Sequence, residues 1–259
     1  MSQLEQDFYE SDVPEVASRA YLALHATQYD QNRFKNTQRF LVERVPLSEL
    51  SILEVGCGGG LWSAFFAQHS RSLTCNDLRP NLVEAARLYV TQTISHEATR
   101  QIRWLTGDLR EVVAGELYDF IFLKDVIEHI EEDVAFLQML NDLLRSGGQL
   151  YLATQNNHSL NYVVEKAYHH LIGNKEWCGW DSTHVRFYNS KLLRHVAHQA
   201  GFIPVAWHGM YHLPYRAITR FLLGAVWERQ YLHLIEDCVG DQWPYSVTGW
   251  AIGVLLQKT

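Results

Sequence analysis

The stretch Ser-Ile-Leu-Glu-Val-Gly-Cys-Gly-Gly-Gly-Leu-Trp-Ser-Ala-Phe-Phe-Ala, residues 51–67, decides the fold. Its first five residues form a short apolar run typical of a buried strand, and residues 61–67 are typical of a helix. Between them, Gly56, Gly58 and Gly60 let the backbone turn tightly and approach a ligand without obstruction by side chains. The sequence therefore predicts a strand, a glycine loop and a helix, an arrangement that suits a nucleoside-type cofactor.

Strand-like and helix-like segments alternate along the chain after this loop. Helices are expected from Pro80 through Val90 and over residues 134–144, where apolar residues recur at helical spacing. Successive β-α units predict an α/β fold of the Rossmann-like type, with a mostly parallel seven-stranded sheet and helices on both faces. The expected strands cover residues 51–55, 72–76, 102–105, 120–123, 149–153, 202–207 and 252–256.

Helical and irregular segments are expected before the sheet and between its last strands. Residues 13–45 predict two helices, broken at the polar run Tyr29-Asp30-Gln31-Asn32. The pair Gly147-Gly148 reads as a helix stop, and Ser190 as the cap of a helix that ends at Gly201.

A single domain is expected, because the chain has neither an internal repeat nor a Pro- or Ser-rich linker. It would span residues 1–259, with a helical cap over residues 1–50 and a cofactor-binding core over residues 51–155. Residues 156–259 would supply a substrate lid, starting with the irregular segment 156–180, and the closing strands. Helical spacing recurs at residues 213–234, and we expect a lid or a homodimer helix there, with peripheral membrane contact as the alternative.

Composition restricts the partners of the chain. The formal net charge is -7 and no run of Lys or Arg resembles a phosphate-binding stripe, which disfavours a nucleic-acid substrate. The acidic N-terminus does not resemble a secretory signal, and no apolar run reaches about 18 residues, so we expect a cytoplasmic protein without a membrane span. The scattered cysteines, Cys57, Cys75, Cys178 and Cys238, are expected to be reduced thiols.

Two acidic residues help to choose among NAD, FAD and S-adenosylmethionine, all of which bind to glycine loops of this kind. Asp77 ends the second strand, where the ribose hydroxyls of a nucleoside would lie. Asp108 follows the third strand, where its carboxylate could accept a hydrogen bond from an adenine amino group. Either residue could instead cap the helix that follows it, and we favour the nucleoside contact for both.

The ordered set of motifs resembles class I S-adenosylmethionine-dependent methyltransferases. The motifs are residues 53–60, Asn-Asp at 76–77, Gly-Asp at 107–108 and Tyr-Asp-Phe-Ile at 118–121. Within that class, residues 124–130 and 144–150 are similar to the small-molecule group that includes ubiquinone-biosynthesis O-methyltransferases. The resemblance covers about residues 36–205.

The resemblance implies S-adenosylmethionine as the cofactor and a hydroxyl of a small molecule as the methyl acceptor. It also implies that Arg39, upstream of the glycine loop, contacts the cofactor carboxylate. Glu54 has two interpretations that can coexist, as a strand-end residue that hydrogen-bonds the loop backbone or as a residue that organises the methionine end of the cofactor. The predicted cofactor contacts are Arg39, Glu54, Gly56, Gly58, Gly60, Asp77, Leu78, Asp108, Leu109 and Lys124.

Methyl transfer requires alignment of the acceptor and, for a hydroxyl, loss of its proton. Histidine suits this task, and His129 and His184 are the candidate bases; each has an alternative interpretation, as a packing residue or as a loop histidine. Resemblance to quinol relatives implies a divalent cation at Asp125, Glu128 and His129, but a solvated acidic helix start explains these residues better, so we assign no metal site here. An N-methyltransferase and a non-catalytic cofactor-binding module are the alternative functions.

Overall fold

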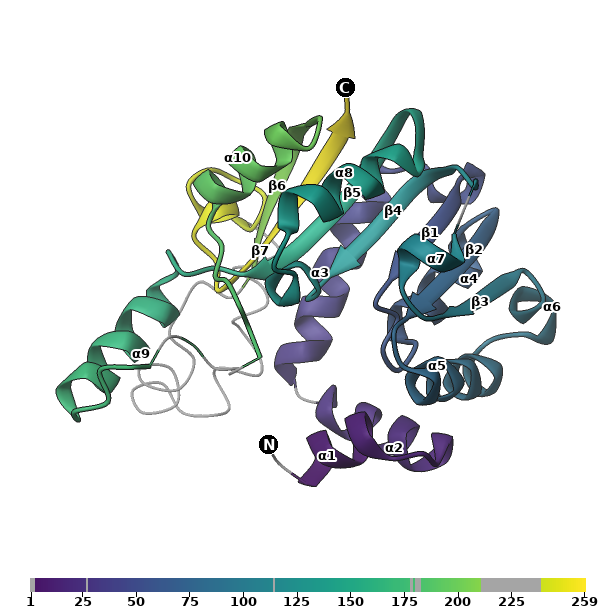
Figure 1. Cartoon of the computed structure of the whole chain (residues 1–259), viewed down its shortest axis with the longest axis horizontal. Coiled ribbons are helices and arrows are strands. Elements are labelled where there is room, and N and C mark those ends of the chain that lie inside the picture. Colours follow the sequence, from purple (N-terminus) through teal and green to yellow (C-terminus); the bar gives the residue numbers. More distant parts are fainter. Residues whose placement is uncertain (1–2, 27, 114, 178, 180–182, 211–238) are drawn as a thin grey trace.

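The computed structural model describes residues 3–26, 28–113, 115–177, 179, 183–210 and 239–259. In these residues, one sheet contains the seven predicted strands, and their order is β3-β2-β1-β4-β5-β7-β6 (Figure 1). The strands are β1 (Ser51–Val55), β2 (Ser72–Asp77), β3 (Ile102–Thr106), β4 (Tyr118–Lys124), β5 (Leu144–Gln155), β6 (Phe202–Met210) and β7 (Ala251–Lys258).

The strand order reverses between β1 and β4. From β1 the chain moves outward through β2 to β3 and then returns to add β4 on the other side of β1, with all these pairs parallel. β7 alone runs antiparallel, between β5 and β6. Ligands of open α/β sheets bind beyond the carboxyl ends of the strands at such a reversal. The topology therefore predicts a binding site at the ends of β1 and β4.

Helices cover both faces of the sheet. Leu53 and Val55 of β1 pack in a core with helices α8 and α10, whereas Ile52 packs in a second core with α3, α4 and α5. This alternation follows from the period of two in a strand. The helices are α1 (Gln3–Glu10), α2 (Pro14–Leu24), α3 (Gln28–Arg44), α4 (Leu61–His69), α5 (Pro80–Thr93), α6 (His96–Thr99), α7 (Leu109–Val112), α8 (Asp133–Asp142), α9 (Leu160–Leu171) and α10 (Ser190–Gln199). Short 3-10 helices are η1 (Leu47–Glu49), η2 (Ile127–His129) and η4 (Tyr245–Val247).

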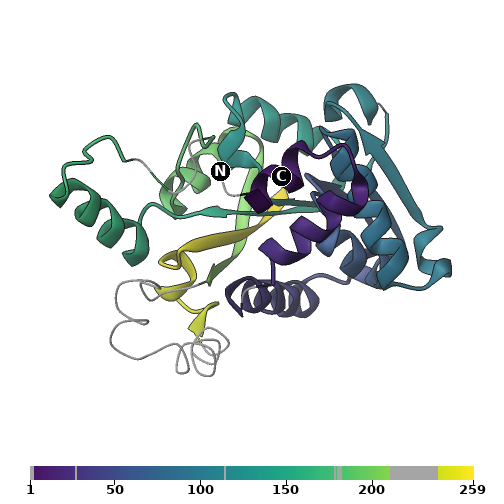
Figure 2. The same cartoon turned by 90° about the horizontal axis from the view of Figure 1, so that it is seen from below.

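Helices α1 and α2 form a cap beyond the carboxyl ends of the parallel strands (Figures 1 and 2). Their apolar residues, Phe8 and Tyr21 among them, pack with Leu82 of α5 in a small separate core. The Arg79 guanidinium, just before α5, donates to the Tyr9 carbonyl oxygen at 2.9 Å and lies over the Tyr9 ring. The cap therefore rests on the segment that follows β2.

Several local predictions need correction. The N-terminal break lies around residues 25–27, and the polar run 29–32 belongs to α3, so polarity alone did not end the helix. Helix α8 ends at Asp142, and Gly147-Gly148 falls inside β5, where the register with β4 shifts between Tyr118 and Phe120. These glycines accommodate an irregularity in the strand instead of stopping a helix.

The segment after β5 also differs from prediction. The interval 156–180 is not wholly irregular, because it contains α9. Asn189, not Ser190, is the N-cap of α10, and its side-chain oxygen accepts from the amides of Lys191 and Leu192. The predicted helical spacing at 213–234 lies outside the described residues. No helix in the described part of the chain is long and apolar enough to cross a membrane.

Asn156, fully buried at the end of β5, joins the last segments of the fold. Its side-chain amide donates to the carbonyl oxygens of Val247 at 3.0 Å and Gly249 at 2.8 Å. Its side-chain oxygen accepts from the His158 amide at 3.0 Å. One side chain therefore fixes the start of the α9 segment against the approach to β7.

The substitution Asn156→Ala is expected to lower the free energy of unfolding by about 3 kcal/mol, because it leaves several polar backbone groups without partners. Urea unfolding followed by circular dichroism measures the change. The exposed Asn174→Ala serves as the control and should change stability by less than about 0.5 kcal/mol. Equal stability of the two variants would contradict this role of Asn156.

Candidate functional site

The glycine loop after β1 is anchored to β2 by its backbone. The amides of Gly56 and Cys57 both donate to the Asn76 carbonyl oxygen at 2.9 Å. Gly58 and Gly60 have φ angles of 51° and 89°, backbone conformations that residues with a Cβ atom rarely adopt. The sequence thus supplies glycine where the turn requires a left-handed backbone, and α4 begins directly after it.

Asp77, the last residue of β2, orients the glycine loop. One carboxylate oxygen accepts from the Gly58 amide at 3.0 Å, and the other accepts from the Arg79 amide at 3.2 Å. Burial raises the pKa of Asp77, and the two amide donors oppose that shift. The next residue, Leu78, is exposed and lies at the same edge. The carboxylate therefore sits between two loops, at the place predicted for ribose contact.

The loop after β3 joins the same edge of the sheet. The Gly107 amide donates to the Asp77 carbonyl oxygen at 3.0 Å. Asp108 is the N-cap of α7 and accepts from the Arg110 amide at 2.9 Å, while the Arg110 side chain lowers the pKa of Asp108 to about 2. Leu109 is buried beneath it. The capping role is thus observed, and adenine contact by Asp108 stays a prediction.

Glu54 is buried near the end of β1, just before the glycine loop. Its carboxylate accepts from the Ser63 hydroxyl of α4 at 2.6 Å and from the Cys75 thiol of β2 at 3.3 Å. Burial raises the pKa of Glu54 to about 7, and the Ser63 hydroxyl opposes the shift. These side-chain contacts join β1, β2 and α4, and a role of Glu54 at the methionine end of the cofactor stays a prediction. The thiols Cys57 and Cys75 are free, and Cys178 and Cys238 lie outside the described residues.

Three charged side chains meet at the end of β4. Arg33 of α3 donates to both carboxylate oxygens of Asp125 at 3.2 Å, and the Lys124 ammonium also contacts this carboxylate. Burial alone would raise the pKa of Asp125, but the charges of Arg33 and Lys124 outweigh it and lower the pKa. Burial and the nearby Arg33 lower the pKa of Lys124. Asp125 therefore stays ionised as the partner of two cations.

Arg33 reaches this edge, and the predicted contact of Arg39 with the cofactor carboxylate stays a prediction. Both lie on α3, which runs away from the cap along the sheet (Figure 1). Six residues of helix span about 9 Å, so Arg39 lies further from the carboxyl ends of the strands. The sequence offered no sign of Arg33, because its partner is 92 residues away.

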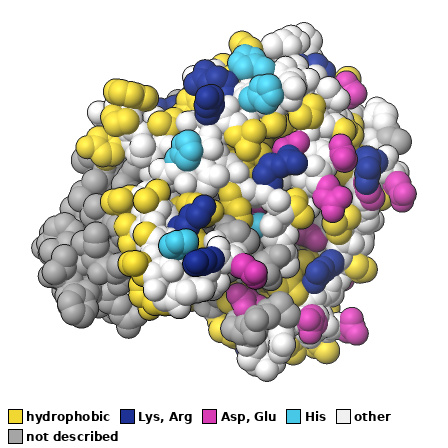
Figure 3. Space-filling model, turned by 60° about the vertical axis from the view of Figure 1, so that its left-hand side comes forward, with side chains coloured by type: hydrophobic (Ala, Val, Ile, Leu, Met, Phe, Trp, Pro, Cys, Tyr) yellow, Lys and Arg dark blue, Asp and Glu magenta, His cyan; other side chains and the backbone are white. Residues whose placement is uncertain are grey.

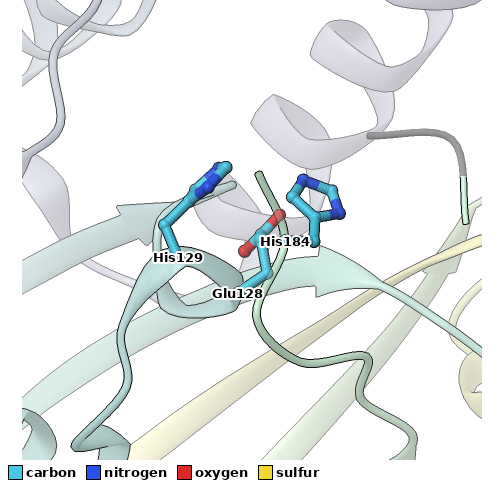
Figure 4. Close-up of side chains that lie close together, drawn as sticks. All are labelled: Glu128, His129 and His184. Carbon is cyan, nitrogen blue, oxygen red and sulfur yellow. The ribbon is translucent and has the colours of Figure 1, made fainter. Parts of the chain in front are cut away.

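Glu128, His129 and His184 converge beyond β4 (Figure 4). One ligand atom from each, a carboxylate oxygen or a ring nitrogen, lies within 4.8 Å of the others. The Val185 amide donates to the Glu128 carbonyl oxygen at 2.9 Å, which holds the His184 segment against η2. The two imidazole rings lie edge to face with centroids 4.8 Å apart. The structure thus brings both predicted histidines together.

The environment of this cluster differs between its members. Burial raises the pKa of Glu128 to about 8, with Asp125 adding to the shift. His129 is exposed, and its Nδ1 lies 3.3 Å from the Thr183 carbonyl oxygen, which leaves Nε2 directed elsewhere. The packing interpretation of His129 is therefore wrong. Asp125, bound to Arg33 and Lys124, does not belong to the cluster.

Tyr21 of the cap packs directly on the glycine loop. A Cβ atom added to Gly59 would lie 2.1 Å from Tyr21 Cγ, so the ring covers the Cα of this glycine. The Leu61 amide, in the first turn of α4, hydrogen-bonds with Tyr21. Sequence reasoning missed this contact, and the unused glycine at position 59 was the one available signal.

Comparison with known proteins agrees with this geometry. The family model for a methyltransferase domain matches residues 25–206, and the chain belongs to this family. The fold and the motifs define a class I S-adenosylmethionine-dependent methyltransferase. The chain is an enzyme, and its cofactor is S-adenosylmethionine.

Individual relatives and structures are similar over different lengths. Ubiquinone biosynthesis O-methyltransferase of Cereibacter sphaeroides is 30% identical over 68% of this chain and 69% of its own length. The protein of the same name from Xylella fastidiosa is 32% identical over 45% of this chain and 46% of its own length, so the chain spans about half the length of that relative. Magnesium protoporphyrin IX methyltransferase from Synechocystis PCC 6803, with bound SAH, shares the fold at a TM-score of 0.63 and 16% identity, covering 98% and 92% of the two chains.

The contact between Tyr21 and Gly59 generates a double-mutant prediction. Gly59→Ala should lower the free energy of unfolding by about 1–3 kcal/mol, because the new Cβ displaces the Tyr21 ring. In a Tyr21→Ala background the same change should cost less than about 0.5 kcal/mol, since the obstruction is gone. Urea unfolding of the four proteins measures the coupling, and an equal cost in both backgrounds would refute the contact.

The raised pKa of Glu54 generates a pH prediction. Its pKa is about 7 in the folded state and near 4.5 when unfolded, so the folded chain holds a proton that the unfolded chain releases in this window. Stability from this group is therefore full below pH 4.5 and falls by about 3 kcal/mol as the pH rises to 7. Glu54→Gln should remove this part of the slope, as seen in unfolding free energies between pH 4.5 and 8. Parallel curves for the two proteins would be the contrary result.

Proposed function

We propose that this enzyme transfers the methyl group of S-adenosylmethionine to a hydroxyl oxygen of a small molecule of the phenol or quinol type. The observation that carries the proposal is the convergence of His129, His184 and Glu128 next to the glycine loop. Val126, which lies between β4 and this cluster, packs so closely on Gly56 that a Cβ there would be 2.6 Å from its methyl carbon. Proton-accepting groups therefore adjoin the loop that holds the cofactor.

In the proposed complex, the loops after β1, β2 and β3 hold the cofactor. The Asp77 carboxylate faces the ribose hydroxyls, and the loop carrying Asp108 and Leu109 lies beside the adenine. The cations at the end of β4, Lys124 and Arg33, neutralise the cofactor carboxylate, in place of the Arg39 contact that the resemblance implied. Helix N-termini and backbone amides also favour an anionic group here.

The reaction itself needs little covalent chemistry from the protein. The acceptor oxygen attacks the methyl carbon, the carbon–sulfur bond breaks with its electron pair going to sulfur, and S-adenosylhomocysteine leaves. The hydroxyl proton passes to a histidine, which later releases it to water. His129 and His184 stand as alternative bases, because both rings belong to one cluster.

A divalent cation is the second candidate for activating the hydroxyl. Glu128 is buried with its carboxylate turned toward two imidazoles, a mixed oxygen and nitrogen donor set that suits a transition metal more than magnesium. A cation held there would lower the pKa of an acceptor hydroxyl. This set differs from the Asp125, Glu128 and His129 set considered from the sequence, because Asp125 pairs with Arg33 and Lys124.

Relatives named as ubiquinone biosynthesis O-methyltransferases support a hydroxyl acceptor over an amine. An amine acceptor would gain less from a nearby base, since a neutral amine attacks before it loses a proton. Two histidines and a buried acid together therefore favour O-methylation. A non-catalytic module would not require them.

The test is methyl transfer to catechol-type phenols, a reduced quinone and amines of matched size, measured as S-adenosylhomocysteine and product mass. Methylated hydroxyls are expected. His129→Ala or His184→Ala should lower kcat by about 10²–10⁴-fold if that histidine is the base, with cofactor affinity unchanged. The exposed His195→Ala on α10 is the matched control and should retain full activity.

A chelator distinguishes a histidine base from a bound cation as the group that activates the hydroxyl. Activity that survives a chelator and recovers in His184→Ala at high pH supports a base, whereas activity restored by added zinc or manganese, and lost in Glu128→Gln, supports a metal. Methylation of amines alone, with no hydroxyl acceptor found, would overturn the proposal.

A further inference from the structure

His184 lies on a segment that belongs to neither a helix nor a strand. The segment, residues 183–187, comes between α9 and α10, and the His184 side chain lies near those of Glu128 and His129 (Figure 4). Its neighbour Val185 is 52% exposed, so apolar burial on that side does not fix the ring. A residue in such a place depends on a few polar contacts for its orientation.

Histidines are common in this chain, which has 13 of them, and several face solvent on the side of the molecule seen in Figure 3. Exposure of an imidazole therefore does not by itself mark a site. His184 differs because it is only partly exposed and its ring lies edge to face with two others. The centroid of its ring is 4.8 Å from that of His129 and 5.4 Å from that of Phe187.

Asp133, the first residue of α8, holds the His184 segment to the body of the protein. One of its carboxylate oxygens accepts from the Val134 amide at 2.8 Å, which ties the side chain to the first turn of α8. The other accepts from the Tyr188 hydroxyl at 2.9 Å and also contacts the Arg186 guanidinium. Asp133 is 6% exposed and Tyr188 is fully buried. One buried carboxylate thus joins α8 to two residues that follow His184.

The same two side chains reach the backbone just before α8. The Arg186 guanidinium donates to the Glu131 carbonyl oxygen at 3.3 Å, and the Tyr188 hydroxyl lies 3.4 Å from the Ile127 carbonyl oxygen. The other two members of the cluster lie on this stretch of backbone, in η2. These contacts therefore bring His184 to the stretch that carries its partners.

The charges at this junction strengthen it. Burial alone would raise the pKa of Asp133, but its contacts with Arg186 and Tyr188 outweigh burial and lower the pKa. Burial raises the pKa of Tyr188, and Asp133 adds to the shift, so the phenol keeps the proton that it donates. Hydrogen bonds to an ionised carboxylate are stronger than those between neutral groups.

We propose that Asp133 is a positioning residue for His184 in methyl transfer. Its contacts with Arg186 and Tyr188 fix the segment that carries the imidazole, and so set where the ring lies relative to Glu128. The inference rests on the proposed function, in which this cluster activates the acceptor hydroxyl. Asp133 acts through His184 and not on the acceptor itself, and a displacement of a reacting group by about 1 Å can cost about 10²-fold in rate.

The kinetic test compares Asp133→Asn, His184→Ala and the double variant in methyl transfer to catechol. Asp133→Asn should lower kcat by about 10-fold to 10²-fold and leave the affinity for S-adenosylmethionine unchanged. Because Asp133 acts through His184, the double variant should be no slower than His184→Ala alone. Arg186→Lys, which keeps the positive charge, should lose less activity than Arg186→Ala.

Hydrogen–deuterium exchange tests the inference without an acceptor. Asp133→Asn should make exchange of the Val185 amide about tenfold faster, because its hydrogen bond to the Glu128 carbonyl oxygen then opens more often. Tyr188→Phe keeps the buried ring, removes the hydroxyl and should have a smaller effect in the same direction. Asp142→Asn, exposed in the last turn of α8, is the matched control and should change neither this exchange nor kcat.

Full kcat in Asp133→Asn, rate losses that multiply in the double variant, or unchanged exchange at Val185 would each overturn the inference. Full activity of His184→Ala, or the absence of any methylated hydroxyl, would instead contradict the function proposed above. In that case the exchange measurement still decides whether Asp133 fixes the His184 segment. Circular dichroism melting checks that all variants fold.

Discussion

The attachment of the glycine loop to β2 is the constraint on which the rest of the site depends. Two loop amides share the Asn76 carbonyl oxygen, and the Asp77 carboxylate takes the amide of Gly58. These bonds fix where α4 begins, where α5 leaves β2 and where the cap helices rest. Because parallel strands β1 and β2 end at one edge, a loop pinned to that edge presents its remaining amides to a ligand. Open α/β sheets bind their ligands at such an edge.

The charged turn at the end of β4 lies beside this loop. Asp125 has a positive φ of 54°, an uncommon conformation for a residue with a side chain. Its ion pairs with Arg33 and Lys124 offset the cost of this strained backbone. This turn directs Val126 onto Gly56 and places η2, with Glu128 and His129, beyond the sheet. The segment of His184 then docks on η2 through one backbone hydrogen bond. A strained turn therefore links the cofactor loop to the proposed acceptor side.

Most of the sheet could be predicted because its evidence is local. The apolar runs of β1 and β4 and the glycine pattern each fit within a few residues, and their order indicated the family. Errors arose where a local signal had two meanings. Gly147-Gly148 suits a helix stop or a strand irregularity, and both Asn189 and Ser190 are good caps. Pairing of β5 with β4 made the glycine pair part of a strand, and backbone geometry made Asn189 the cap.

The sequence by itself determined the strands, the glycine loop, Asp77 at its strand end and the class of cofactor, because each depends on neighbours along the chain. Only the tertiary structure decided which distant side chains meet. In the folded chain Arg33 contacts Asp125, Tyr21 packs on Gly59 and His184 lies close to Glu128. The apolar side of α9 is exposed. These contacts join segments tens of residues apart, and periodicity carries no information about pairs at that separation.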